Sequence, residues 1–200
     1  MELAELEAKV RELQDIEEIK KLQHIYGYYL DNRLGDQIID LFSDDTELVD
    51  IGGVYLGKEG VKKVFKRFGG GPIPGEMQLH AMEQPVIDVD PDGRTAKGRW
   101  RIIWSRTQKI EGELKALWAQ GLYENEYIKE NGKWKFKKLV LWINYRTPYE
   151  DGWVKTPIAG RGNTMELPEE IRPDKPSTVP GPYPSTDFLP FHYKNPITGK

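Results

Sequence analysis

Three short turns link four long stretches in which apolar and polar residues alternate, and this pattern constrains the fold more than any other feature of the sequence. The stretches cover residues 77–89, 94–109, 114–129 and 134–147, and the turns are Asp92-Gly93, Glu111-Gly112 and Asn131-Gly132. Alternation with a period of two is typical of β-strands, and Asp-Gly or Asn-Gly between two such runs indicates a tight hairpin. This half of the chain is therefore predicted to form a four-stranded antiparallel meander.

The residues before this region have the three- and four-residue spacing of helices. Residues 2–34 are predicted to be helical, with a possible break near Asp15, and shorter helices are predicted over 37–42 and 58–68. A strand over 46–51, closed by Gly52-Gly53, separates the two short helices. Three helices followed by a meander indicate an α+β domain, in which the helices cover one face of a strongly curved antiparallel sheet.

The prolines divide the chain into two parts. Ten of the 14 prolines lie between Pro148 and Pro196, so residues 1–148 are predicted to be the folded domain and 149–200 a Pro-rich extension. A disordered tail is normally poor in large apolar side chains, whereas this one contains Trp153, Phe188 and Phe191, among others. An ordered strap, packed on its own domain or on a neighbouring subunit, is therefore expected rather than a floppy tail.

Composition excludes several classes of function. A net charge of -3 gives no electrostatic case for a nucleic-acid partner or a membrane surface. The acidic start is unlike a signal peptide, so a cytoplasmic location is expected. The chain has no cysteine and three histidines, His24, His80 and His192, without the spacing of a metal site. Neither a dinucleotide-binding glycine motif nor a serine nucleophile elbow is present, so no metal and no cofactor is predicted.

Two of the predicted strands carry more apolar residues than expected for a sheet with one face exposed to solvent. Residues 139–143 read Leu-Val-Leu-Trp-Ile without alternation, and Ile103 lies between Ile102 and Trp104. An antiparallel sheet covered on one face usually leaves the other face polar. Burial of the second face by another subunit is therefore expected, and the protein is predicted to be a homo-oligomer.

The order of elements resembles the nuclear transport factor 2-like superfamily, specifically its SnoaL-like enzymes, over about residues 12–150. The most specific segment is 125–139, which reads Asn-Glu-Tyr-Ile-Lys-Glu-Asn-Gly-Lys-Trp-Lys-Phe-Lys-Lys-Leu, followed by 143–148. It is similar to the branch that contains hexachlorocyclohexane dehydrochlorinase and scytalone dehydratase; diarylpropane lyases, which remove formaldehyde from lignin-derived dimers, belong to the same superfamily. The resemblance implies a cone-shaped α+β barrel, a cofactor-free enzyme, and a homotrimer in preference to a dimer.

The resemblance also implies a catalytic pair. In this branch an aspartate near the end of the first long helix pairs with a histidine on the first long strand, and Tyr29-Leu30-Asp31 and Gln78-Leu79-His80 match these positions. A carboxylate would hold the imidazole in one tautomer and stabilise the imidazolium formed when it takes a proton. Scytalone dehydratase has a tyrosine directly before this aspartate, where this chain has Leu30, and a second histidine on the next strand, where this chain offers Arg101, Trp104 or Arg106. Scytalone dehydration itself is therefore not expected.

Aromatic and polar side chains complete the predicted site. Those expected to bind substrate inside the cone are Tyr26, Tyr28, Tyr55, Arg101, Trp104, Trp118, Asn144 and Tyr145. The aromatic rings suit a flat apolar substrate, and an arginine suits a phenolate or a departing oxyanion.

The predicted function is a lyase that acts on a small aromatic compound by His/Asp acid–base catalysis. Elimination such as dehydration, or loss of formaldehyde from a lignin-derived diarylpropane, would fit. An isomerase or polyketide cyclase of the same fold, and a non-catalytic module that binds a small ligand or a protein, remain alternatives.

Overall fold

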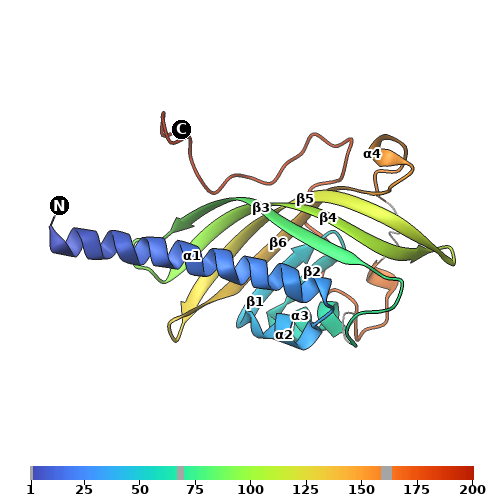
Figure 1. The fold of residues 1–200 in the computed structure, drawn as a ribbon, viewed down its shortest axis with the longest axis horizontal. Helices are drawn as coiled ribbons and strands as arrows, with labels where there is room; N and C mark the ends of the chain where they lie inside the picture. Colours follow the sequence, from blue (N-terminus) through green and yellow to red (C-terminus); the bar gives the residue numbers. More distant parts are fainter. Residues whose placement is uncertain (1, 67–69, 159–163) are drawn as a thin grey trace.

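A long helix lies along one face of a strongly curved sheet in the computed structural model, which describes residues 2–66, 70–158 and 164–200 (Figure 1). The helices of the domain are α1 (Leu3–Asp31), α2 (Gly35–Asp40) and α3 (Gly57–Phe65). The strands are β1 (Phe42–Asp50), β2 (Gly53–Leu56), β3 (Gln78–Val89), β4 (Thr95–Ile110), β5 (Glu113–Glu130) and β6 (Lys133–Pro148). The α+β class is as predicted, and the predicted end of the third helix at residue 68 lies outside the described residues.

The sheet is mixed rather than wholly antiparallel. Its strand order is β2-β1-β6-β5-β4-β3, and β1 pairs in parallel with β6. The prediction of an antiparallel sheet was wrong at this pairing because β1 and β6 are far apart in sequence, and no local turn signals their contact. Strand β2, four residues long, pairs with the end of β1 and was not predicted.

The hairpin prediction is confirmed. The four long strands begin and end within one residue of the predicted bounds. At two of the turns both residues have positive φ, namely Glu111 and Gly112 (52° and 88°) and Asn131 and Gly132 (50° and 73°). This backbone geometry matches the right-handed twist of the strands that it joins.

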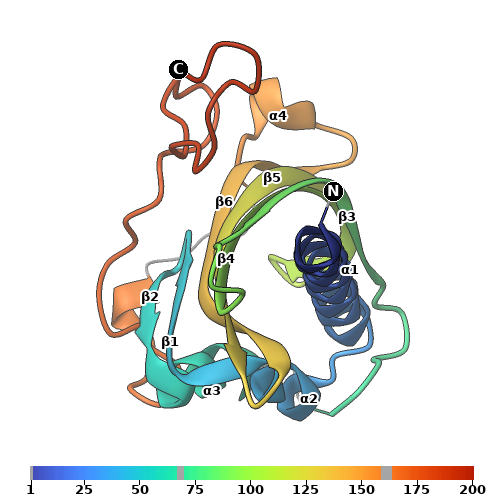
Figure 2. The same ribbon diagram turned by 90° about the vertical axis from the view of Figure 1, so that its left-hand side faces the viewer.

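Helix α1 runs without a break through Asp15, where the sequence allowed one. The carboxylate of Asp15 is buried; it accepts a hydrogen bond from the Trp134 indole N–H at 3.0 Å and pairs with Lys129. The C-terminal half of the helix lies in the concave side of the sheet (Figure 2). No helix among the described residues has the length and apolar character needed to cross a membrane.

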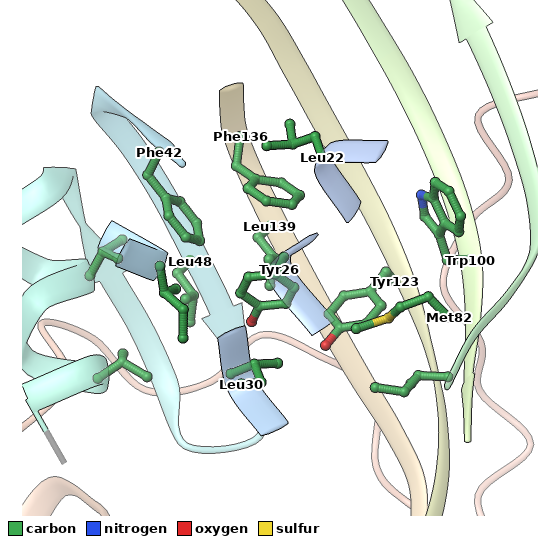
Figure 3. Packing of buried hydrophobic residues seen from close by; sticks show 14 of the residues in the cluster. Leu22, Tyr26, Leu30, Phe42, Leu48, Met82, Trp100, Tyr123, Phe136 and Leu139 are labelled. Carbon is green, nitrogen blue, oxygen red and sulfur yellow. The ribbon is translucent and has the colours of Figure 1, made fainter. Parts of the chain in front are cut away.

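The hydrophobic core fills the space between α1 and the sheet (Figure 3). Tyr26 lies at its centre, with edge-on contacts at centroid distances of 5.3 to 6.3 Å to the rings of Phe42, Phe65, Tyr123 and Phe136. Such edge-to-face pairs stabilise a core beyond their simple burial. The aromatic residues thus fix how the helix sits in the sheet, and with it the position of the helix end.

The C-terminal residues run along the outer, convex side of the sheet (Figures 1 and 2). They include the short helices α4 (Gly152–Lys155) and η2 (Thr164–Glu166). The Trp142 indole N–H donates to the carbonyl of Gly181 at 3.3 Å, and the Arg99 guanidinium donates to the carbonyl of Leu189 at 3.2 Å. Trp142 is therefore covered by its own chain, so its burial does not require the second subunit that the apolar run suggested. The division into 1–148 and 149–200 stays a prediction.

Candidate functional site

Asp31 and His80 are in direct contact where the end of α1 meets the start of β3. The Oδ1 atom of Asp31 lies 2.7 Å from the Nδ1 atom of His80, and the backbone N–H of His80 donates to the same oxygen at 2.9 Å. The side chains are mostly buried, at 9% exposure for His80 and 21% for Asp31. The aspartate therefore holds both the ring and the backbone of the histidine.

A glycine allows this close approach of helix and strand. A Cβ atom placed on Gly27 would lie 3.3 Å from the carbonyl oxygen of His80 and 3.3 Å from the Cε of Met82. Both distances are tighter than ordinary van der Waals contact, so a larger residue would push α1 away from β3. The glycine, which lowers helix propensity, thus serves the contact between Asp31 and His80.

The contact with Asp31 determines how the His80 ring can act. A carboxylate accepts hydrogen bonds, so in the neutral ring Nδ1 carries the proton and Nε2 has the free lone pair. The ring stacks on Trp104 with the centroids 5.6 Å apart and the planes at 24°. Held from two sides, the imidazole can accept a proton at Nε2, and the carboxylate stabilises the resulting positive charge.

His80 lines a cavity of about 310 Å³ between α1, α3 and the sheet. This volume is at the lower end of those of small-molecule sites. The apolar part of the wall consists of Leu30, Leu48, Ile51, Val64, Phe65, Trp104, Leu139, Leu141 and Ile143. The polar and charged part consists of Tyr26, Arg33, Asp50, Gln78, Arg106, Tyr123 and Arg146.

Two tyrosine hydroxyls in this wall hydrogen-bond to each other. Tyr26 and Tyr123 are at most 4% exposed, and burial raises the pKa of both phenols above the ordinary value. Their hydroxyls point in the same direction between the helix and the sheet (Figure 3). Both therefore stay protonated at neutral pH, and the hydroxyl that accepts in this pair still has its own proton to donate to a ligand.

A row of in-register residues crosses four strands at the level of the histidine. His80 on β3 pairs with Trp104 on β4, Trp104 with Ala119 on β5, and Ala119 with Arg146 on β6. Gln78 and Arg106 form the next row on the same face. Residues that are paired across strands lie on the same face of a sheet, so His80, Arg106 and Arg146 all line the concave side.

Two of the eight predicted substrate-binding residues, Tyr26 and Trp104, line this cavity, and the other six lie elsewhere. Tyr28 is on the outer face of α1 and is 69% exposed, whereas Tyr55 on β2 is buried in the core and does not line the cavity. Arg101 is exposed and donates from Nε to the Gln84 side chain at 2.6 Å. Its neighbours Trp100 and Ile102 are fully buried, so the pleat of β4 directs Arg101 outward.

The remaining three predicted residues lie on the convex face. Trp118 and Tyr145 pack against each other and against Trp153 of α4, with centroids 4.8 to 5.3 Å apart. Asn144 accepts a hydrogen bond at its backbone carbonyl from the N–H of Tyr183, at 2.7 Å. These placements correct the prediction that they line the pocket.

A β-bulge explains the error on β6. Gly121 pairs with Ile143 but Gln120 pairs with Tyr145, so Asn144 is an extra residue in β6. The extra residue reverses the alternation beyond it: Tyr145 points outward and Arg146 inward. Strict alternation from Ile143 predicts the opposite, so the residue pattern of β6 by itself does not place Arg146 in the wall.

Three further charged residues of the wall, Arg33, Asp50 and Arg106, were not among the predicted binding residues, although Arg106 was considered as an alternative to Arg101 and Trp104. Arg106 could have been found by counting two residues from Trp104 along a regular strand, since positions i and i+2 share a face. Arg33 follows α1 in the left-handed conformation, with φ of 56°, and Asp50 ends β1 beside the turn to β2; neither has a signal in the sequence. Among the described residues, no group of three or more His, Asp or Glu side chains is arranged to hold a metal ion.

Comparison with known proteins agrees with this architecture. The SnoaL-like domain family matches residues 11–140. A scytalone dehydratase-like protein from Novosphingobium aromaticivorans superposes with a TM-score of 0.60 at 22% identity, covering 77% of this chain and 99% of its own. A type 2 hexachlorocyclohexane dehydrochlorinase superposes with a TM-score of 0.60 at 24% identity, covering 70% and 92%. The type 3 enzyme from Novosphingobium barchaimii LL02 gives 0.58 at 20% identity, covering 70% and 93%.

At these identities the solved structures establish a shared fold. The family match extends from the first third of α1 to the middle of β6 and includes both Asp31 and His80. The chain belongs to the SnoaL-like family of the nuclear transport factor 2-like superfamily.

Proposed function

We propose that this protein is a cofactor-independent lyase in which His80 removes a proton from a small aromatic substrate and Asp31 positions the histidine. The observation that carries the proposal is the 2.7 Å contact between Asp31 and the His80 ring at the wall of the cavity. General bases work best when their geometry is held by packing and hydrogen bonds. Here the hydrogen bond to Asp31 and the stacking contact with Trp104 together fix the orientation of the His80 ring.

The arrangement can support two kinds of elimination. In a dehydration, the proton of a C–H bond moves to Nε2 of His80, the electron pair forms the double bond, and the C–O bond breaks. The hydroxyl group leaves as water with the proton that His80 has taken up, and the protonated hydroxyls of Tyr26 and Tyr123 can supply a hydrogen bond to it. In a loss of formaldehyde, an O–H proton moves to His80, the C–C bond breaks as the C=O bond of formaldehyde forms, and the carbon that receives the electron pair takes the proton back from His80.

The relatives support this reaction class. Two of the structural neighbours are named as a dehydratase-like protein and a dehydrochlorinase, and both names describe eliminations. The apolar wall beside His80 suits an aromatic body, for which a lignin-derived compound is our preferred candidate. We further propose a cytoplasmic homo-oligomer, favouring a trimer, which light scattering would test.

Substitution of the pair tests the proposal. On a panel of aromatic alcohols and diols, His80→Ala should reduce turnover about 10²- to 10⁴-fold, the range for loss of a general base. Asp31→Asn keeps the shape of the side chain but removes the charge that stabilises the imidazolium, so it should lower kcat more than it changes KM. His24→Ala is the matched control, because His24 packs edge-on against Trp100 at 5.7 Å and does not line the cavity.

Product analysis separates the proposal from its alternatives. A lyase product is lighter than its substrate by the fragment lost, whereas an isomerase product has the same mass and a binding module gives no product. Full activity of His80→Ala, or products of unchanged mass throughout the panel, would contradict the proposal.

A further inference from the structure

The wall of the cavity carries an excess of positive charge. Three arginines, Arg33, Arg106 and Arg146, line it together with a single carboxylate, Asp50. With His80 neutral, three positive charges and one negative charge leave a formal charge of +2 on the lining side chains. A site for a neutral aromatic compound has no need of such charge, and burying it costs free energy unless a counter-charge is present.

Two carboxylates of this region, Asp50 in the wall and Glu76 beside it, have partners of their own. The Oδ1 atom of Asp50 accepts the backbone N–H groups of Gly52 and Gly53, at 2.6 and 3.1 Å. Glu76 pairs with Arg33 at 3.2 Å. Neither, in these contacts, neutralises Arg106.

Arg106 has unfilled hydrogen-bonding capacity and, unlike Arg33, forms no ion pair with a described residue. Its Nε atom is shielded from solvent and has no hydrogen-bond partner, and no carboxylate among the described residues lies within ion-pair distance of its side chain. Burial lowers the pKa of the Arg106 guanidinium; the charge of Glu76 opposes this shift, and that of Arg33 adds to it. An anion placed against the guanidinium would supply the missing acceptor and the missing charge.

The position of Arg106 relative to the base defines the shape of the ligand. Arg106 lies two residues beyond Trp104 on β4, which is about 7 Å along a strand on the same face, and Trp104 stacks on His80. A planar ring lying over the apolar wall can therefore place one end beside His80 and an anionic substituent on the opposite end at Arg106.

We propose that the cavity binds an aromatic carboxylate, with Arg106 as the residue that recognises its carboxylate group. The proposal deepens the proposed function and rests on it for the assignment of this cavity as the substrate site. A carboxylate fits better than a phosphate, because its two oxygens match the planar fork of an arginine and one negative charge suits a wall that is otherwise largely apolar. It also replaces the sequence-based choice of Arg101 with an arginine that lines the cavity.

Calorimetric titration with cinnamate and its neutral amide, cinnamamide, tests the proposal. The two probes have the same ring and nearly the same shape and differ in charge. The wild-type protein should bind cinnamate at least about tenfold more tightly, as expected for a charge-assisted hydrogen bond. Arg106→Gln should abolish this preference, whereas Arg101→Gln, on the outer face of the same strand, should keep it.

Two further variants make the result decisive. Arg106→Lys keeps the charge and should retain part of the preference, so the test does not depend on one substitution; circular dichroism verifies that each variant is folded. His80→Ala should retain the preference, because the carboxylate is assigned to Arg106 and not to the imidazole. The proposal would be overturned if the wild-type protein binds both probes equally or binds neither. It would also be overturned if the preference survives Arg106→Gln or is lost in His80→Ala.

The binding test fails or succeeds independently of the catalytic one. Cinnamate selectivity without any elimination activity would support the anion site and contradict the lyase. Elimination activity on neutral aromatic compounds, without a preference for cinnamate, would support the lyase and contradict the anion site.

Discussion

Three buried tyrosines make the stability of this protein sensitive to alkaline pH. Tyr26, Tyr123 and Tyr127 are 4%, 1% and 1% exposed, and burial is the largest cause that raises the pKa of each phenol. In the unfolded chain the same phenols titrate near pH 10. Above that pH the unfolded state loses protons that the folded state keeps, so the free energy of unfolding falls as pH rises.

The size of the effect follows from the number of protons. Each tyrosine that is ionised in the unfolded state and protonated in the folded state lowers the free energy of unfolding by about 1.4 kcal/mol per pH unit. The three together give up to about 4 kcal/mol per unit above roughly pH 10. Since small domains are stable by about 5–15 kcal/mol, two pH units in this range remove about 8 kcal/mol, which is enough to unfold a protein at the lower end of that range.

Urea unfolding at a series of pH values measures the slope, and a tyrosine variant isolates its cause. Lysines also titrate in this range, so the informative quantity is the difference in slope between the wild-type protein and Tyr127→Phe, which should be about 1.4 kcal/mol per pH unit. The substitution also removes the hydrogen bond from the Trp100 indole at 2.9 Å, which lowers stability at every pH without changing the slope. Tyr149→Phe is the control, because that ring is 75% exposed. Identical slopes for the wild-type protein and Tyr127→Phe would refute the reasoning.

Two further predictions concern stability. Asp15→Ala should lower the free energy of unfolding by about 3 kcal/mol, because it leaves the Trp134 indole N–H without its acceptor and Lys129 without its partner. In urea unfolding, the control Glu12→Ala, on the exposed face of the same helix, should stay within about 0.5 kcal/mol of the wild-type protein. Equal losses for the two variants would contradict the role given to Asp15. Gly121→Ala should lower the melting temperature strongly, because its Cβ would lie 2.3 Å from the Trp142 carbonyl oxygen, a backbone atom that a rotamer change cannot move. Gly181→Ala, whose Cβ would meet nothing closer than 3.7 Å, should melt close to the wild-type protein, and a Gly121→Ala variant as stable as this control would show that the strand can shift.

Local chemistry in the sequence was enough to predict the hairpins. The turn residues at 111–112 and 131–132 set the backbone at each reversal, and alternation set the strand lengths. The pair of Asp31 and His80 was predicted from the resemblance to a family, and the structure brings the two side chains together. Their catalytic role stays a proposal.

The composition of the cavity was decided by tertiary structure. The bulge at Asn144 turns Arg146 inward and Tyr145 outward, and a bulge arises from how two strands pair rather than from the residues of one strand. The parallel pairing of β1 with β6 joins segments that are about 90 residues apart and brings Asp50 into the same wall as His80. Sequence by itself determined the long helix and the four long strands, because turns and periodicity are local. The charges that face the ligand depend on strand register, which only the folded chain specifies.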